Sequence, residues 1–196
     1  MIIEDLKRAI QLMDDNWIKQ NNILDYKTKF IYDIKDYDSL IKVSHLLLSK
    51  DDDINYAIHR WVNLQISNAC EELFCKYGAK KVENKKDKEK DIYINDIPFD
   101  VKVTNYPSTA YENFNLDSEY GKADLATWLY NNQSSEGRQH FKNRIFVVCC
   151  GKNNEEKWKN RTNLVLLENS IKEFMLSPNL IELDNLGVVC NIIVIQ

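Results

Sequence analysis

Two uninterrupted apolar runs in the second half of the chain restrict its fold more than any other feature. Residues 144–150 read RIFVVCC, and residues 187–195 read GVVCNIIVI. A strand with one exposed face alternates between apolar and polar residues, whereas a strand covered on both faces is apolar throughout. Such strands need helices on both sides of their sheet, so the two runs predict an α/β protein. The shorter apolar run at 164–167 is predicted to be a further buried strand.

Helical periodicity dominates the part of the chain before these runs. Apolar residues recur three and four positions apart in residues 1–53, which predicts several short helices, and again from about 54 to 77, which predicts one long helix. Gly78 stands where a helix commonly ends, because glycine adopts the left-handed conformation of a C-terminal cap without strain. Another helix is predicted near 117–132, and Ser170 begins a capping-box pattern for a last one.

Between the long helix and the helix near 117–132, the period changes to two residues, which predicts three short strands. These strands are expected at Ala79–Glu83, Asp91–Asn95 and Ile97–Thr104. The core order is then helix, three strands, helix, strand, with strand additions toward the C-terminus, so the predicted fold class is α/β with a mixed sheet. The acidic run at 51–53 indicates a division into an N-terminal helical extension, 1–53, and an α/β core, 54–196, that together form one compact unit.

The composition is that of an ordinary globular protein. Hydrophobic residues make up 44% of the 196 residues, enough for a core, and the net charge of −4 is too small to keep the chain unfolded. The N-terminal segment MIIEDLKRAIQLMDD carries acids where a secretory signal has a basic and then an apolar run. No stretch reaches about 18 uncharged apolar residues, so we expect a cytoplasmic protein without membrane contact. The five cysteines include no Cys-x-x-Cys pair, which favours buried thiols over a zinc site.

The hairpin expected around Asn95 and Asp96 carries the residues of greatest chemical interest. If these two residues form the turn, Asp91 faces Asp100 across the strand pair, and alternation places Lys102 on the same face as Asp100. Directly opposed residues have Cβ atoms about 4.5–5.5 Å apart, and like charges in that position destabilise the pair. Two carboxylates and an ammonium therefore share a face for which folding alone gives no reason.

A divalent cation would remove the repulsion between Asp91 and Asp100. Mg²⁺ prefers oxygen ligands and keeps several of its waters, so one or two carboxylates and the phosphate oxygens of a substrate suit it, and Mn²⁺ can substitute. A bound cation lowers the pKa of a water and stabilises charge at phosphorus, while Lys102 can orient or deprotonate that water. These groups predict metal-assisted hydrolysis of a phosphodiester. The alternative is a hairpin whose solvent face simply carries two aspartates and a lysine.

In this order of elements, the same residues resemble the PD-(D/E)XK nuclease superfamily, which has the restriction-endonuclease-like fold. The resemblance covers roughly residues 55–150, about half of the chain, and includes the segments RWVNLQISNACEELF, FDVKVTNYP and WLYNNQSSEGRQHFKNRIFVV. It implies Asp91, Asp100 and Lys102 as catalytic residues. It also implies a metal held by the two aspartates, by the backbone carbonyl of Val101 and by an acidic residue of the long helix.

The chain departs from the superfamily pattern at one position, and the acid of the long helix has two candidates. Asp91 follows Lys90, where the name of the superfamily has a proline. For the helix acid, a helical wheel places Glu72 at the edge of the apolar stripe, whereas the family-like pattern Glu-x-Leu-Phe selects Glu71. We take Glu71 as the catalytic and metal-binding acid, with two solvated helix acids as the alternative.

Polar and basic residues around residue 140 are candidates for contacts with nucleic acid, because such groups bind phosphates and base edges. The candidates are Gln133, Arg138, His140 and Arg144. Residues 80–90 hold six lysines against three acids, and residues 138–161 hold seven lysines and arginines against two acids. Basic stretches of this kind bind phosphates in a salt-dependent way, although lysine-rich solvated turns have the same composition.

The sequence thus predicts a divalent-metal-dependent nuclease, with DNA as the expected substrate. A nuclease-fold protein that only binds nucleic acid or another protein is the alternative. Enzymes of the superfamily often need two copies to cut both strands, so the resemblance also implies that the protein can form a homodimer. A composition rich in Asn, Lys and Ile is typical of AT-rich microbial genomes and indicates a bacterial source.

Overall fold

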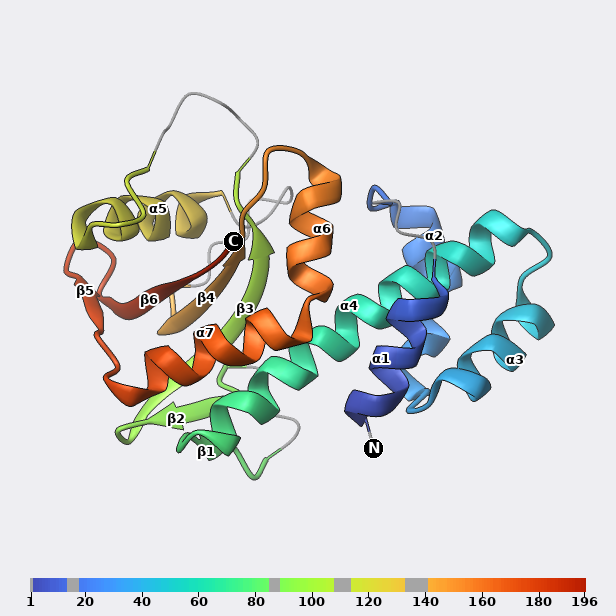
Figure 1. Cartoon of the computed structure of the whole chain (residues 1–196), viewed down its shortest axis with the longest axis horizontal. Coiled ribbons are helices and arrows are strands. Elements are labelled where there is room, and N and C mark those ends of the chain that lie inside the picture. The colour runs from blue at the N-terminus through green and yellow to red at the C-terminus, as the bar shows by residue number, and fades with distance from the viewer. Residues whose placement is uncertain (1, 14–17, 85–88, 108–113, 133–140) are drawn as a thin grey trace. The chain divides into compact units, whose positions relative to one another are not determined.

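The computed structural model describes residues 2–13, 18–84, 89–107, 114–132 and 141–196 (Figure 1). The chain divides into two compact units, Met1–Ala69 and Cys70–Gln196. The division falls inside the long helix α4 (Asp51–Lys76), whereas the acidic run at its start had indicated a boundary at residue 53. The last turns of α4 therefore belong to the same unit as the sheet.

The N-terminal unit is helical, as the periodicity of its sequence predicts. Its elements are α1 (Ile2–Leu12), α2 (Asn22–Lys27), the 3-10 helix η1 (Lys29–Asp33), α3 (Tyr37–Leu47) and the first part of α4. The side chains of Asn21 and Asp36 accept backbone N–H groups at the first turns of α2 and α3, which is the usual role of such residues at a helix start. Leu6, Leu40 and Trp61 are fully buried and form part of its core.

In the C-terminal unit, the described residues form one mixed sheet of six strands in the order β1-β2-β3-β4-β6-β5. The strands are β1 (Lys80–Lys81), β2 (Ile92–Ile94), β3 (Ile97–Asn105), β4 (Arg144–Cys149), β5 (Ile181–Leu183) and β6 (Val188–Ile195). The central strands β3, β4 and β6 are parallel, and the outer pairs are antiparallel. The predicted α/β class with a mixed sheet is confirmed.

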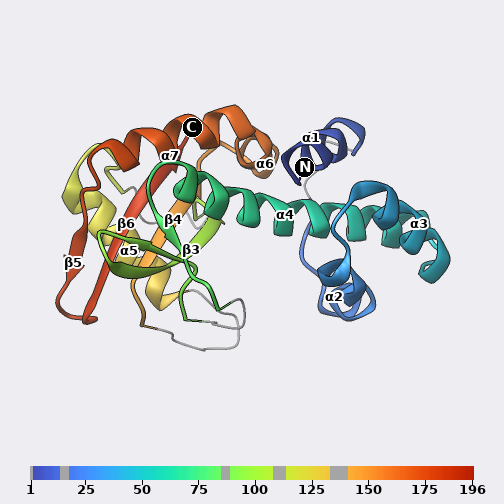
Figure 2. The same cartoon turned by 90° about the horizontal axis from the view of Figure 1, so that it is seen from below.

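Helices cover both faces of the central strands. Figure 2 shows α5 (Glu119–Asn131) on one face and α7 (Leu164–Leu176) on the other. Phe146 and Val148 of β4 pack with Leu125 and Leu129 of α5, and alternation turns the intervening residues of β4 to the opposite face. Every residue of β4 is buried, which confirms that its continuous apolar run is a strand covered on both sides.

The cysteines contribute to this packing as small apolar groups. All five lie within the described residues, and none forms a disulfide. Cys70, Cys149 and Cys190 are buried, and burial raises the pKa of the Cys70 thiol to about 12. The expectation of buried thiols is confirmed for these three.

The hairpin of β2 and β3 forms as its turn residues predict. Asn95 and Asp96 have φ values of 50° and 64°, the pair of positive values that a type I′ turn requires. The closing pair is Ile94 and Ile97, and the ladder continues to the pair of Ile92 with Phe99. In this register Asp91, the residue before β2, lies beside the edge of β3.

Two predictions on the segment after β4 are wrong. Residues 164–167 are not a strand but the first turn of α7, which Asn163 caps by accepting the Leu166 N–H at 3.1 Å. The helix therefore starts before Ser170, the expected start, and buries Leu167 and Ile171 four residues apart on one face. A run of four apolar residues is compatible with either structure, and the continuing helical period decides. The sequence analysis also missed α6 (Asn154–Thr162).

In the part of the chain that the structure describes, no helix has the length and apolar character needed to cross a membrane.

Gly78 ends α4 in the conformation that the sequence predicts. Its N–H donates to the Cys75 carbonyl, and the N–H of Ala79 donates to the Phe74 carbonyl, which together form a Schellman cap. The φ of Gly78 is +113°, a value that residues with a side chain rarely adopt. This turn directs the chain from the helix toward the sheet.

We expect the substitution Gly78→Ala to lower the free energy of unfolding by about 1–2 kcal/mol, because alanine resists a positive φ. An added Cβ would meet no atom within 4 Å, so the loss reports backbone strain and not a clash. Urea denaturation followed by circular dichroism measures it. An unchanged midpoint would show that the cap contributes little to stability.

Candidate active site

Asp91 is fixed against the edge of β3 at the point where β2 stops pairing with it. Its backbone N–H donates to the Phe99 carbonyl at 2.8 Å, and its carboxylate oxygen Oδ2 accepts the Val101 N–H at 2.8 Å. The Asp91 carboxylate thus accepts the Val101 N–H, which a backbone carbonyl of β2 would accept if the ladder continued. Because the N–H and carbonyl of one strand residue point to the same side, the Val101 carbonyl lies on this edge as well.

Asp100 lies one residue before Val101 and makes two ion pairs. Its Oδ1 is 2.8 Å from Lys142 Nζ, and its Oδ2 is 2.6 Å from Arg144 Nε. The parallel register of β3 and β4 sets Asp100 beside Arg144. The sequence analysis proposed Arg144 as a nucleic-acid contact, and the structure buries this side chain against Asp100. Lys142 was not identified, because its relation to Asp100 depends on the pairing of β3 with β4.

Glu71, on the last turns of α4, is electrostatically coupled to both aspartates. Burial raises the pKa of its carboxyl to about 7, and repulsion from Asp91 and Asp100 adds to the effect, against the attraction of Lys81. Burial also raises the pKa of Asp91, the Val101 N–H opposes that rise, and repulsion from Asp100 reinforces it. Glu71, the helix acid that the family-like pattern selects, thus lies in the field of both aspartates.

Lys102 follows Asp100 on the same face of β3, as the alternation predicts. Although the residue is exposed overall, the surrounding protein desolvates its ammonium and lowers its pKa. The positive charges of Arg144, Arg161 and Lys142 lower it further, while Asp100 raises it. A lysine with a lowered pKa exchanges a proton more readily near neutral pH, so Lys102 is suited to acid–base work.

Arg161 of α6 is a second residue that the sequence analysis missed. Its Nη2 donates to the Val103 carbonyl at 2.6 Å, two residues beyond Val101 and on the same edge of β3. Its Nε is buried and has no hydrogen-bond partner among the described residues. Nothing in the sequence pointed to this residue, because α6 itself was not predicted.

Oxygen donors for a divalent cation are present here, but among the described residues they do not form a preformed metal site. Within the described residues, no three His, Cys, Asp or Glu side chains converge as a metal-binding group. Asp91, Glu71 and the Val101 carbonyl supply the hard oxygen ligands that Mg²⁺ prefers. Each Asp100 oxygen is in an ion pair, yet a carboxylate has about four acceptor sites, so both can accept a further partner. The donor set therefore fits Mg²⁺ in chemistry.

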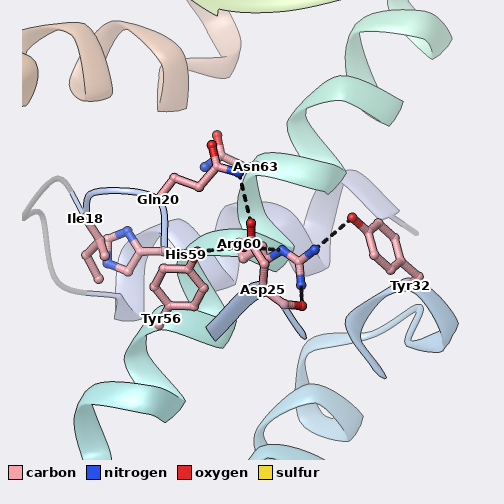
Figure 3. A pocket seen from close by; sticks show the side chains of 8 residues that line it. All are labelled: Ile18, Gln20, Asp25, Tyr32, Tyr56, His59, Arg60 and Asn63. Carbon is pink, nitrogen blue, oxygen red and sulfur yellow. Dashed lines mark hydrogen bonds and ion pairs between the residues drawn. The ribbon is translucent and has the colours of Figure 1, made fainter. Parts of the chain in front are cut away.

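A cavity of about 340 Å³ lies in the N-terminal unit, away from these residues in the sequence (Figure 3). Its polar side chains bind one another: the Arg60 guanidinium pairs with Asp25 and donates to the Tyr32 hydroxyl, and the Tyr56 hydroxyl donates to Asp25 at 2.6 Å. His59 is buried beside them. We interpret this network as part of the internal structure of the unit.

Three of the proposed nucleic-acid contacts, Gln133, Arg138 and His140, lie outside the described residues. Comparisons of the chain with models of protein families, with curated proteins and with solved structures found no match. The function must therefore be argued from the residues of the site themselves.

The raised pKa of Glu71 predicts a pH-dependent gain in stability for Glu71→Gln. Between about pH 4.5 and 7 the folded protein retains a proton that the unfolded chain has released, so stability falls as the pH rises through this window. Above pH 7 the variant lacks the unfavourable charge and should be more stable by about 1–2 kcal/mol, allowing for solvent screening. Below pH 4.5 the two proteins should be equal.

Urea unfolding at pH 4.5 and pH 8 measures this difference, both values bracketing the shift of Glu71. Glu72→Gln is the matched control, since it removes the neighbouring carboxylate of the same helix. An equal gain in both variants at pH 8 would mean that the effect comes from the negative charge of the helix in general and not from the burial of Glu71 and its repulsion by the aspartates.

Proposed function

We propose that this protein is a divalent-metal-dependent nuclease of the PD-(D/E)XK type that hydrolyses phosphodiester bonds in DNA. One observation carries the proposal: the Asp91 carboxylate accepts the N–H of Val101, the residue between Asp100 and Lys102 in β3, and Glu71 of the preceding helix is electrostatically coupled to both aspartates. Burial, reinforced by repulsion among these acids, raises the pKa values of Glu71 and Asp91, so their charged forms are held at a cost to folding stability.

The order of the elements supports the same proposal. Helix α4 precedes the antiparallel strands β1, β2 and β3, and α5 connects β3 to the parallel strand β4. This is the succession of helix, three strands, helix and strand by which the sequence resembles the restriction-endonuclease-like fold. In this proposal, the acid of the helix, the aspartate before the second strand and the Asp-x-Lys of the third strand would serve as the site residues of that fold.

The proposed roles follow from the position of each group. Asp91, Asp100, Glu71 and the Val101 carbonyl would hold Mg²⁺ or Mn²⁺, which when bound lowers the pKa of a water and neutralises charge at phosphorus. Lys102 would orient the attacking water or take its proton. Lys142 and Arg144 hold the Asp100 carboxylate in place between β3 and β4.

The first prediction of this proposal concerns cleavage. Wild-type protein should nick or cut supercoiled plasmid DNA with Mg²⁺ or Mn²⁺ and not with EDTA. Lys102→Ala should lower the rate at least about 100-fold, the usual contribution of a general acid or base. Asp91→Asn should abolish cleavage, while the circular dichroism of both variants remains that of the wild type.

Asp96→Asn is the matched control for this assay. It removes the charge of an exposed aspartate at the turn of the same hairpin, where the carboxylate pairs with Lys80 at 2.7 Å. This variant should cleave as the wild type does. Cleavage that persists in EDTA, or that Lys102→Ala leaves at full rate, would overturn the proposal. Asp100→Asn is less informative, because it removes the negative charge that pairs with the buried Arg144 and is expected to destabilise the fold itself.

A nuclease-fold protein that binds nucleic acid without cleaving it is the second candidate. It is favoured by the ion pairs of Lys142 and Arg144 with the two Asp100 oxygens, since these cations already neutralise the carboxylate. In this case the positive groups of the site would serve to bind phosphates.

Calorimetric titration with Mn²⁺ and DNA retention at two salt concentrations separate the two candidates. If the protein is a nuclease, it should bind Mn²⁺, and Asp91→Asn should abolish this binding. DNA retention that weakens with salt, without any Mn²⁺ binding, would favour the second candidate. Binding of neither ligand would contradict both candidates and favour an interaction with another protein.

A further inference from the structure

We propose that a cavity beside Lys102 binds one unpaired nucleobase of the substrate strand. This inference rests on the proposed nuclease function and names what that site recognises. The cavity measures about 230 Å³ and lies within the C-terminal unit, between the second half of β3 and the end of α5. It shares Lys102 with the candidate active site, so a ligand there lies next to the proposed point of cleavage.

The walls of the cavity suit a flat, apolar ring with polar edges. The cavity is lined by Trp128 and Leu129 of α5, by Phe146 of β4 and by Pro107 after the end of β3. Aromatic side chains stack on the face of any base, and this stacking is a main source of affinity for single strands. The partly exposed Trp128 ring is therefore the proposed stacking platform.

Polar groups at the same walls can meet the edge of a base. Thr104 and Asn132 line the cavity, and the Asn132 side-chain amide donates to the Trp128 carbonyl at 2.9 Å. This bond fixes the amide beside the tryptophan and leaves its oxygen as an acceptor. Small apolar cavities with a few placed polar groups are the usual form of a specific ligand site.

The size and position of the cavity favour one base over a whole nucleotide or a base pair. Its volume is below the roughly 300–1,000 Å³ typical of pockets for drug-sized ligands. At about 3.3 Å per strand residue, Thr104 lies only about 7 Å along β3 from Lys102. A phosphate at Lys102 and its neighbouring base in the cavity are thus within the span of adjacent groups of one nucleotide strand. Since a paired base cannot enter, the cavity selects single-stranded or flipped-out bases.

Binding of a fluorescent single-stranded oligonucleotide in EDTA tests the proposal without cleavage. An abasic residue is introduced at each position in turn, and the dissociation constants are measured by anisotropy. In the wild type, one abasic position should weaken binding about 5- to 100-fold, the range that loss of one base stack produces. Trp128→Ala should weaken binding of the intact strand by the same factor and be insensitive to that abasic position.

Trp128→Phe should retain most of the affinity, because it keeps an aromatic face. Tyr120→Ala is the matched control, since Tyr120 is an aromatic residue of the same helix that is 86% exposed and outside the cavity. Thermal melting verifies that each variant is folded. Wild-type affinity in folded Trp128→Ala, or a full abasic effect in that variant, would overturn the proposal.

This test and the plasmid assay fail independently. If the protein cleaves DNA with metal but no abasic position weakens binding, the proposal of a base-binding cavity is overturned and the proposed nuclease function stands. A positive scan that Trp128→Ala abolishes, without any cleavage, supports the cavity and overturns the nuclease.

Discussion

The bond between the Asp91 carboxylate and the Val101 N–H is the interaction on which the arrangement of the site depends. A strand edge normally satisfies its peptide groups by pairing with the next strand, and β2 does so for β3 only as far as Phe99. Beyond that point the Asp91 side chain accepts the Val101 N–H in place of a strand backbone. A side chain covers less of the edge than a strand does, so the Val101 carbonyl stays at the side where Glu71 and Asp91 gather.

Cations of the neighbouring elements offset the charge that this arrangement concentrates. Lys142 and Arg144 pair with Asp100, and both are largely buried, so the loss of one partner would leave an uncompensated charge. Within the described residues, neither Glu71 nor Asp91 forms an ion pair as close as those of Asp100, and burial together with repulsion raises their pKa values. The unbalanced negative charge thus lies on the α4 side of β3, where an added cation would stabilise the protein.

The sequence predicted the parts of this site that local chemistry determines. The Asn95-Asp96 turn requires positive φ values, and the Gly78 cap needs glycine, so the hairpin and the end of α4 followed from a few residues. The ion pairs of Asp100 depend on the parallel register of β3 with β4, which no local pattern encodes. The helix at 164–176 was mistaken at its start for a strand, because four apolar residues have no period of their own. The roles proposed for the acids and the lysine remain predictions.

The alternation of β3 connects the reactive groups with the cavity beside them. Asp100, Lys102 and Thr104 point to the face that α5 covers, whereas Val101 and Val103 are buried on the other face. Helix α5 packs closely on Phe146 and Val148 of β4, where the strand is apolar, but β3 presents polar side chains to it. A helix cannot bury an ammonium as it buries a phenylalanine, so the packing of α5 opens toward β3. We attribute the cavity beside Lys102 and Trp128 to the polar side chains on this face of β3, and Lys102 is both the residue of the proposed chemistry and part of the cavity wall.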